Sequence, residues 1–101
     1  MSFAIPAKRL LDNSMLVAFR HPVPSYQTHI LILPKRKYRS LTEVPADDTE
    51  FMSALLAAVR SLVEELGLEQ KGYRLIVNGG PAKDVEILHF HLVSAEMEEI
   101  S

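Results

Sequence analysis

The sequence predicts an α+β fold, with a five-stranded, mostly antiparallel sheet and one long helix. Short apolar segments bounded by turn residues occur in two groups, one before residue 35 and one after residue 72. Between the groups, apolar residues recur every three or four positions, which is typical of one face of a helix. The connections within each group are short, and short connections favour antiparallel pairing. We therefore expect a single domain over residues 1–101.

The first two strands are predicted to form a hairpin. Arg9-Leu10-Leu11 and residues 15–19 are short apolar runs, and residues 12–14, Asp-Asn-Ser, separate them. The side chains of Asp, Asn and Ser bond to nearby backbone groups and so favour turns. The turn therefore joins two antiparallel strands.

A third strand is predicted at residues 29–33. Pro22 and Pro24 open the loop before it, and Pro34 ends it, because proline cannot donate to a sheet ladder. The next five residues, 35–39, are basic apart from one tyrosine. One short cluster in a chain with a net charge of −2 favours a solvated loop over an anion- or nucleic-acid-binding patch.

The periodic segment predicts a helix that begins after Asp47 or Asp48 and ends near Leu66. Aspartate accepts hydrogen bonds from the free N–H groups of a first helical turn, and Gly67 is typical of a left-handed helix end. The apolar stripe is expected to pack on the sheet as part of the core. Its members are Met52, Leu55, Val59, Leu62, Val63 and Leu66.

Two further strands are predicted to complete the sheet. Residues 73–77 form the fourth, residues 78–81 end it, and residues 85–93 form the fifth. Alternation along the fifth strand places one set of side chains on the face away from the helix: Ile87, His89, His91 and Val93. The opposite set is expected to pack on the helix stripe: Leu88, Phe90 and Leu92.

The two histidines of the fifth strand are candidates for phosphate chemistry. They lie about 7 Å apart along a strand and can converge on one small ligand. If one ring nitrogen donates to a carbonyl, the other presents a lone pair that can attack phosphorus. The spacing alone also fits two surface histidines, since half-exposed strands alternate in this way. For Tyr26, in the loop before the third strand, packing on the surface is favoured over a place at the pocket edge.

Composition excludes several classes of protein. Without cysteine, the chain has neither disulfide bonds nor thiolate metal sites. Its net charge of −2 predicts no attraction to nucleic acid or to an anionic membrane. The first residues lack the basic start and apolar run of a signal peptide, and no apolar run approaches the roughly 20 residues that span a bilayer. We expect a cytoplasmic protein.

The surroundings of the two histidines resemble the closing motif of the histidine-triad (HIT) family, in which His-apolar-His-apolar-His precedes two apolar residues. Residues 78–80, Asn-Gly-Gly, and residues 88–93, Leu-His-Phe-His-Leu-Val, match this motif. Other segments resemble the family's opening hairpin, central strand and following strand: residues 5–8 with 17–19, residues 28–35 and residues 72–78. The resemblance implies the family's antiparallel sheet with a long helix, usually paired into a two-fold homodimer.

The resemblance also implies a role for each matching residue. His89 falls at the middle triad position, the nucleophile that attacks the α-phosphate and forms a nucleotidyl-histidine intermediate. His91 falls close to the phosphate and leaving group, and His29 lines the same pocket. Asn78 would help to hold the phosphate, while the turn at Gly79-Gly80 lets backbone approach it. That chemistry needs no metal or other cofactor.

The nucleoside side of the expected site departs from the family pattern. Ile5 and Phe19 match apolar residues around the base. His21, however, stands where the family usually has an acidic residue that grips the ribose hydroxyls. A histidine can accept one such bond, but not the paired bonds that a carboxylate accepts.

The triad and the loop before it also depart from the family pattern. Ile87 occupies the first triad position, which supports the site rather than attacking, so we expect weakened rather than abolished chemistry. The loop after Gly80 is shorter, and Asp84 replaces a small hydroxyl-bearing residue near the leaving group. A carboxylate there repels phosphate unless it is protonated or paired, for example with Lys83, and it could also serve as a proton donor.

These residues favour a hydrolase or transferase that acts on a phosphoanhydride or phosphoramidate of a nucleotide or another phosphorylated small molecule. Two alternatives stay open. The departures described above would suit a nucleotide- or phosphate-binding protein that has lost efficient catalysis. The spacing of His89, His91 and Glu96 also occurs in metal-binding cupin barrels, although the long helix is foreign to that fold.

Overall fold

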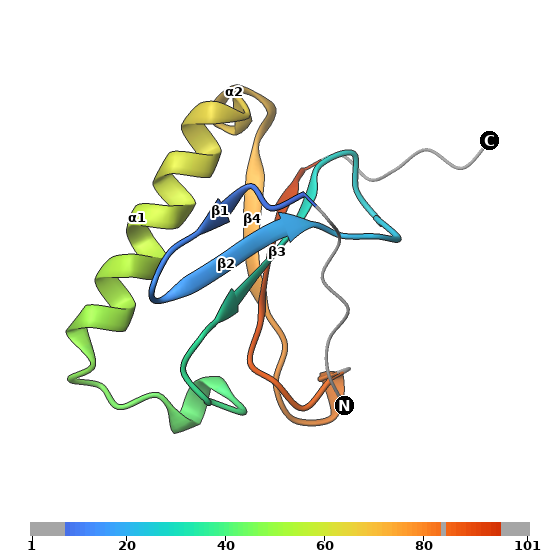
Figure 1. Cartoon of the computed structure of the whole chain (residues 1–101). Coiled ribbons are helices and arrows are strands. Elements are labelled where there is room, and N and C mark those ends of the chain that lie inside the picture. Colours follow the sequence, from blue (N-terminus) through green and yellow to red (C-terminus); the bar gives the residue numbers. More distant parts are fainter. Residues whose placement is uncertain (1–7, 84, 96–101) are drawn as a thin grey trace.

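The computed structural model describes residues 8–83 and 85–95. In these residues five strands form one sheet in the order β1-β2-β3-β5-β4, and every neighbouring pair is antiparallel. The strands are β1 (Leu11–Asp12), β2 (Leu16–Arg20), β3 (His29–Pro34), β4 (Tyr73–Val77) and β5 (Phe90–Ser94). The long helix α1 (Thr49–Glu65) lies beside the sheet (Figure 1). The predicted α+β class is confirmed.

The first hairpin turns at Asn13, as the sequence predicts. The Asn13 side-chain oxygen accepts hydrogen bonds from the backbone N–H groups of Met15 and Leu16, at 2.8 and 2.9 Å. This side chain thus replaces backbone partners inside the turn. Leu11 then pairs with Ala18 and starts the β1–β2 ladder.

Helix α1 begins at the predicted place. The Asp48 carboxylate accepts a hydrogen bond from the backbone N–H of Phe51 at 3.1 Å, so it caps the first turn. The chain leaves the helix through Gly67, whose φ of 65° is left-handed. A second, four-residue helix, α2 (Leu68–Lys71), follows. Its shortness left no periodic signal in the sequence. Two 3-10 turns, η1 (Leu41–Glu43) and η2 (Gly80–Ala82), complete the described elements.

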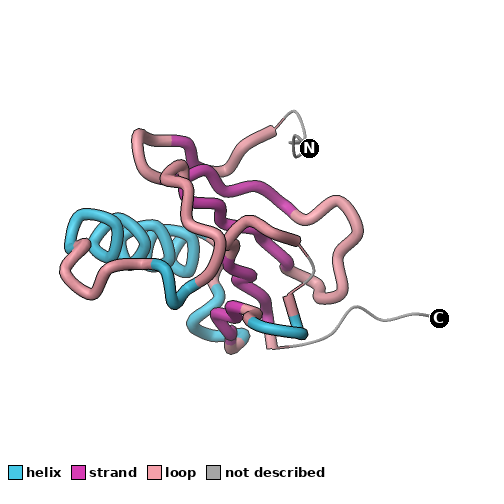
Figure 2. The backbone as a smooth tube through the Cα atoms, turned by 90° about the horizontal axis from the view of Figure 1, so that it is seen from below, coloured by secondary structure: helices cyan, strands magenta, loops and turns pink. Residues whose placement is uncertain are grey.

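One face of α1 packs against one face of the sheet, which Figure 2 shows from below. The core between them includes Phe51, Leu55 and Leu62 from the helix and Leu88, Phe90 and Leu92 from the last part of the chain. The predicted burial of those last three side chains is therefore confirmed. Met52 is a correction, because 40% of it is exposed, and Phe51 beside it fills the core position.

The start of the fifth strand is a second correction. The sequence predicted a strand over residues 85–93, but β5 begins only at Phe90. The residues before it attach to the loop after β3: the Leu88 N–H donates to the Tyr38 carbonyl at 3.1 Å. The Lys83 ammonium bonds to the carbonyls of Arg39 and Glu86, at 2.9 and 3.4 Å. These bonds hold the segment in a bent conformation, which apolar alternation does not reveal.

No helix in the described part of the chain combines the length and apolar character needed to cross a bilayer.

Candidate functional site

The four histidines of the chain gather on the sheet face opposite α1, although 70 residues separate the first from the last. His21 follows β2. Its backbone N–H donates to the backbone carbonyl of His29 at 2.8 Å, which joins it to the start of β3. His91 lies in β5, paired with Leu31 of β3, and His89 directly precedes that strand. The ring centroids are 4.4 Å apart for His21 and His29, 5.1 Å for His29 and His91, and 5.0 Å for His89 and His91.

Backbone donors determine which nitrogen of two of these rings carries hydrogen. The Val23 N–H donates to His21 Nδ1 at 3.0 Å, and the Ser25 N–H donates to His29 Nδ1 at 3.1 Å. A ring nitrogen that accepts such a bond cannot itself carry hydrogen, so a neutral His21 or His29 carries it on Nε2. The His29 Nε2 atom lies 2.9 Å from His91 Nδ1. His29 therefore donates to His91, and the neutral His91 ring carries its own hydrogen on Nε2.

His89 is oriented in the opposite sense. Its Nδ1 lies 2.8 Å from the carbonyl oxygen of Ile87, which can only accept a hydrogen bond. The hydrogen of a neutral His89 is therefore on Nδ1, and Nε2 presents a lone pair. The bond uses the backbone of residue 87, so it forms although the side chain there is isoleucine. The site thus combines a nitrogen lone pair, on His89 Nε2, with N–H groups on His91 Nε2 and His21 Nε2.

Burial keeps the supporting rings neutral. Burial, followed by repulsion from His21 and His91, lowers the pKa of His29 to about 4. Burial, and then repulsion from His89, also lowers the pKa of His21. Near neutral pH both rings are therefore uncharged, and the pattern of donors and acceptors described above applies.

A cavity of about 370 Å³ opens beside these rings. Its walls are Ser25, Tyr26, His29, Ile76, Asn78 and His91. The Tyr26 ring meets the His29 ring edge-on, with centroids 5.4 Å apart. Tyr26 therefore lies at the cavity rather than packing elsewhere on the surface, which corrects the sequence-based preference.

Sequence reasoning missed two other residues of this wall. Ile76 pairs with His91 across β4 and β5, and strand alternation places it on the histidine face. That contact could be predicted only once the register was known. The contribution of Ser25 comes from its backbone N–H rather than its hydroxyl, so the residue type carries no signal.

Of the residues predicted to bind phosphate, Asn78 is the one placed beside the histidines. It also lines a smaller cavity of about 200 Å³ together with Gly79 and Gly80. Gly80 has a left-handed φ of 55° and open space around the position of a Cβ atom, so a side chain there would strain the backbone rather than clash. The Lys83 ammonium is bonded to loop carbonyls, and Asp84 lies outside the described residues.

The residues predicted to surround a nucleotide base are not seen at the cavity beside the histidines. Phe19 is completely buried, in a cluster with Val17, Leu31 and Leu33, and presents no surface to a ligand in this conformation. Ile5 lies outside the described residues. The side chain of Ile87, in the first triad position, lines a third cavity of about 550 Å³ with residues 34–39 and Glu43.

The metal alternative gains no support in the described residues. There, no three or more His, Cys, Asp or Glu side chains are placed to hold a metal ion. Glu96, the carboxylate of that hypothesis, lies outside the described residues. The histidines that are close together are linked to one another and to backbone groups.

The antiparallel sheet with one long helix is the fold of a histidine triad protein from Clostridium difficile, which superposes with a TM-score of 0.82 at 27% identity, over 96% of this chain and 86% of that one. The HIT domain family matches residues 2–98, and the chain belongs to this family. It is 33% identical to an uncharacterised HIT-like protein of Synechococcus elongatus, over 87% of this chain and 76% of that protein. It is 28% identical to the purine nucleoside phosphoramidase of Escherichia coli, over 87% of this chain and 74% of the enzyme. A HIT family hydrolase of Legionella pneumophila superposes with a TM-score of 0.82 at 32% identity, over 91% of this chain and 84% of that one.

Proposed function

We propose that this protein is a nucleotide hydrolase or transferase that cleaves a phosphoanhydride or phosphoramidate through a nucleotidyl-histidine intermediate at His89. One observation carries the proposal. The bond from His89 Nδ1 to the Ile87 carbonyl leaves Nε2 as a lone pair in a site where every other histidine is also oriented. The similarity to a purine nucleoside phosphoramidase supports the same reaction class.

The proposed reaction has two steps. In the first, His89 Nε2 attacks the α-phosphorus, an N–P bond forms, and the bond from phosphorus to the leaving oxygen or nitrogen breaks. The Nε2 hydrogen of His91 can bond to the leaving atom and stabilise its developing charge, and the leaving group takes its proton from the solvent. In the second step, water or another acceptor attacks the same phosphorus and loses its proton to the solvent, while the pair of electrons in the N–P bond returns to His89 Nε2.

The residues around His89 and His91 position the reacting groups. His29 donates to His91 Nδ1, which keeps the His91 hydrogen on Nε2. The Asn78 amide lies in the same cavity and can donate to a phosphate oxygen. Gly80 keeps the loop backbone open to the ligand, and for Lys83 and Asp84 contact with phosphate stays a prediction from the sequence.

The direct test uses adenosine and guanosine 5′-phosphoramidates and dinucleoside polyphosphates as substrates. We expect turnover by the unmodified protein and by Ser53→Ala, a control on the exposed side of α1. His89→Ala should reduce kcat by at least about a thousandfold. Acid quenching followed by mass spectrometry should find a nucleotidyl adduct on the unmodified chain and none on the variant. Full activity in His89→Ala would contradict the proposal.

The binding alternative is separated on the same samples. The substitutions at Ile87 and His21 are the observations that favour it. A protein that only binds nucleotide gives a ligand-dependent rise in Tm without product. Such a result with every substrate would replace the enzymatic proposal with the binding one.

We further propose that two copies associate through the β4 edge. Tyr73 and Leu75 are each 40% exposed on the last strand of the sheet, and Met52 and Leu56 are exposed four residues apart on one face of α1. An edge strand with uncovered apolar side chains favours pairing with a second chain. Light scattering during gel filtration should give the mass of a dimer, and Leu75→Glu should give that of a monomer. A monomer for the unmodified protein at tens of micromolar would rule this out.

A further inference from the structure

A single peptide unit orients the His89 ring. The Ile87 carbonyl accepts a hydrogen bond from His89 Nδ1 at 2.8 Å. The N–H of the same peptide unit belongs to Leu88 and donates to the Tyr38 carbonyl at 3.1 Å. The described residues contain no cis peptide bond, so the N–H and C=O groups of this unit point in opposite directions. The unit is therefore held between the loop after β3 on one side and the His89 ring on the other.

Packing does little to fix the chain just before this peptide unit. Val85, Glu86 and Ile87 are exposed and precede the start of β5, and burial begins only at Leu88. Ile87 and residues 34–39 line the same cavity of about 550 Å³, so open space adjoins both. The position of residues 85–87 therefore depends mainly on polar contacts with the loop.

The Lys83 side chain supplies such a contact. Its ammonium donates to the Arg39 carbonyl at 2.9 Å and to the Glu86 carbonyl at 3.4 Å. The first bond is the stronger of the two, because 3.4 Å is long for a hydrogen bond. Arg39 is the neighbour of Tyr38, and Glu86 is the neighbour of Ile87. These two bonds, the Lys83 bridge, thus join the loop to the segment directly beside the peptide unit that orients His89.

Both ends of the Lys83 bridge are fixed by backbone bonds of their own. The Lys83 N–H donates to the Gly80 carbonyl at 3.1 Å, at the end of the 3-10 turn η2. In the loop, the Tyr38 N–H donates to the Arg36 carbonyl at 2.9 Å. Lys83 is also absent from the walls of the two cavities that Asn78 lines. The ammonium is therefore directed at backbone carbonyls rather than at the space beside the histidines.

We propose that Lys83 is a positioning residue: the Lys83 bridge keeps the Ile87 carbonyl opposite His89 Nδ1 and so keeps the lone pair of His89 on Nε2. Without the bridge, this carbonyl turns away for part of the time. A neutral ring then also carries its hydrogen on Nε2, where the hydrogen blocks attack. This inference rests on the proposed function for the role of His89 as nucleophile, whereas the orientation of the ring is a property of the ligand-free protein.

The test compares three variants with the unmodified protein. Lys83→Met removes the ammonium and keeps an unbranched stem, whereas Lys83→Arg keeps a charged donor that can bond to carbonyls. Lys37→Met is the matched control, because it removes the same charge from an exposed position of the loop. Long-range ¹H–¹⁵N NMR spectra of the ligand-free proteins at about pH 8, above the ordinary range of imidazole titration, report which nitrogen of His89 carries hydrogen.

We expect hydrogen on His89 Nδ1 in the unmodified protein, in Lys83→Arg and in Lys37→Met, and a mixture of both tautomers in Lys83→Met. On a substrate that the unmodified protein turns over, Lys83→Met should lower kcat on the order of tenfold and leave KM within about twofold, and Lys83→Arg should restore kcat. The inference is overturned if His89 keeps its hydrogen on Nδ1 in Lys83→Met, or if Lys83→Arg or Lys37→Met disturbs the ring as much. With an unchanged ring, a rise in KM at constant kcat would identify Lys83 as a phosphate contact instead.

The ligand-free spectra separate this inference from the proposed reaction. A changed tautomer in Lys83→Met supports the positioning role even if no substrate is turned over. A changed tautomer with an unchanged kcat contradicts the role of His89 as nucleophile and leaves the positioning of its ring intact. An unchanged tautomer together with His89-dependent turnover contradicts only the role of Lys83.

Discussion

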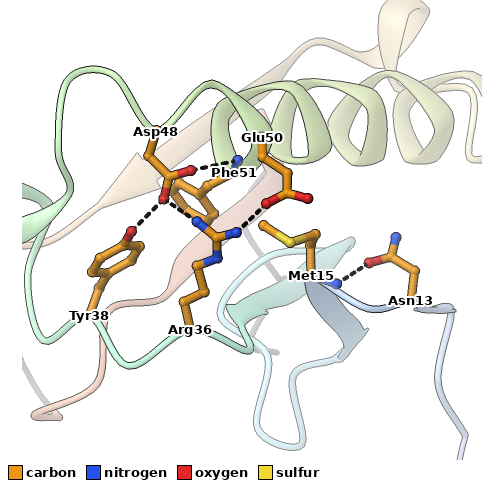
Figure 3. Close-up of polar contacts among 7 residues, drawn as sticks. All are labelled: Asn13, Met15, Arg36, Tyr38, Asp48, Glu50 and Phe51. Carbon is orange, nitrogen blue, oxygen red and sulfur yellow. Dashed lines mark hydrogen bonds and ion pairs between the residues drawn. The ribbon is translucent and has the colours of Figure 1, made fainter.

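Strand β3 has a polar cluster at each end, and the two clusters are held together by opposite means. At its first residue, His29 joins a group of neutral rings that backbone N–H groups and neighbouring imidazoles orient. Beyond its last residue, Arg36 and Tyr38 reach the start of α1, where they bond to Asp48, and Arg36 also bonds to Glu50 (Figure 3). The first cluster has directional hydrogen bonds with little charge, whereas the second is an ion-pair network.

The different kinds of contact at the two ends of β3 suit different roles. Asp48 caps α1 and receives the Tyr38 hydroxyl, the Phe51 N–H and the Arg36 guanidinium, so it attaches the β3 exit loop to the helix. The Tyr38 hydroxyl, and then the Phe51 N–H and Arg36, lower the pKa of Asp48. Charge suits an attachment near the surface, but a charged ring could not serve as a nucleophile. The basic segment 35–39, predicted to be a solvated loop, thus has part of its charge engaged in ion pairs.

Among changes to the two clusters at the ends of β3, the largest expected effect comes from His29. In His29→Leu, His91 loses the donor that holds its hydrogen on Nε2, so we expect kcat to fall on the order of a hundredfold. Leucine fills the same space but cannot bond to the Ser25 N–H or to His91 Nδ1, so Tm should also fall. Steady-state kinetics and a melting curve on one preparation measure both quantities. An unchanged kcat would show that the His29–His91 bond does not orient the site.

Breaking the ionic cluster should lower the stability of the fold and leave kcat unchanged. Asp48→Ala removes the cap of α1 together with the partners of Tyr38 and Arg36. We expect Tm to fall by about 5 °C, as for the loss of one helix cap in a domain of this size. kcat measured well below Tm should stay unchanged. A comparable loss of kcat would mean that the two ends of β3 are coupled.

Acid is expected to weaken the clusters in different pH ranges. A histidine in the unfolded chain titrates near 6.5, whereas the pKa of folded His29 is about 4, so between these values the unfolded chain binds more protons. The free energy of unfolding therefore falls as pH drops from about 6.5 to about 4. The pKa of Asp48 is lowered from 3.8, so its contribution is present above that value and is lost as pH falls below it.

Urea unfolding at a series of pH values measures both effects. His29→Leu should show a smaller loss of stability between pH 6.5 and 4 than the unmodified protein, and His21, whose pKa is also lowered, accounts for part of what is left. Asp48→Ala should lose the same amount of stability as the unmodified protein between pH 6.5 and 4, and should lose less than the unmodified protein in stronger acid. Identical pH profiles for all three chains would contradict the assignment of the two groups.

The smallest effect is expected for Glu50→Gln. This carboxylate is 70% exposed, and its partner Arg36 keeps its bond to Asp48 when Glu50 is neutralised. Exposed ion pairs contribute little, so Tm should change by no more than about 1 °C. A change as large as that of Asp48→Ala would show that the network acts as one unit.

Much of the fold could be predicted because it depends on local patterns. Two aspartates before an apolar stripe, Asp47 and Asp48, predicted the start of α1, and residues 12–14 between two apolar runs predicted the first turn. The bounds of β4, Tyr73–Val77, were predicted correctly. The start of β5 was not, because residues 85–89 alternate like a strand while a distant loop holds Leu88 and Lys83. Met52 was misplaced for a related reason, since periodicity alone does not say which edge of an apolar stripe the sheet covers.

The sequence by itself determined the fold class, the family resemblance and the set of histidines available for chemistry, because these follow from residue types and spacing. Only the tertiary structure decided what each histidine can do. A neutral imidazole is a donor or an acceptor at a given nitrogen according to the group opposite it, and those groups are the backbone atoms of residues 23, 25 and 87 and another ring. Every residue type supplies such backbone atoms, so their part in orienting the site depends on the folded chain.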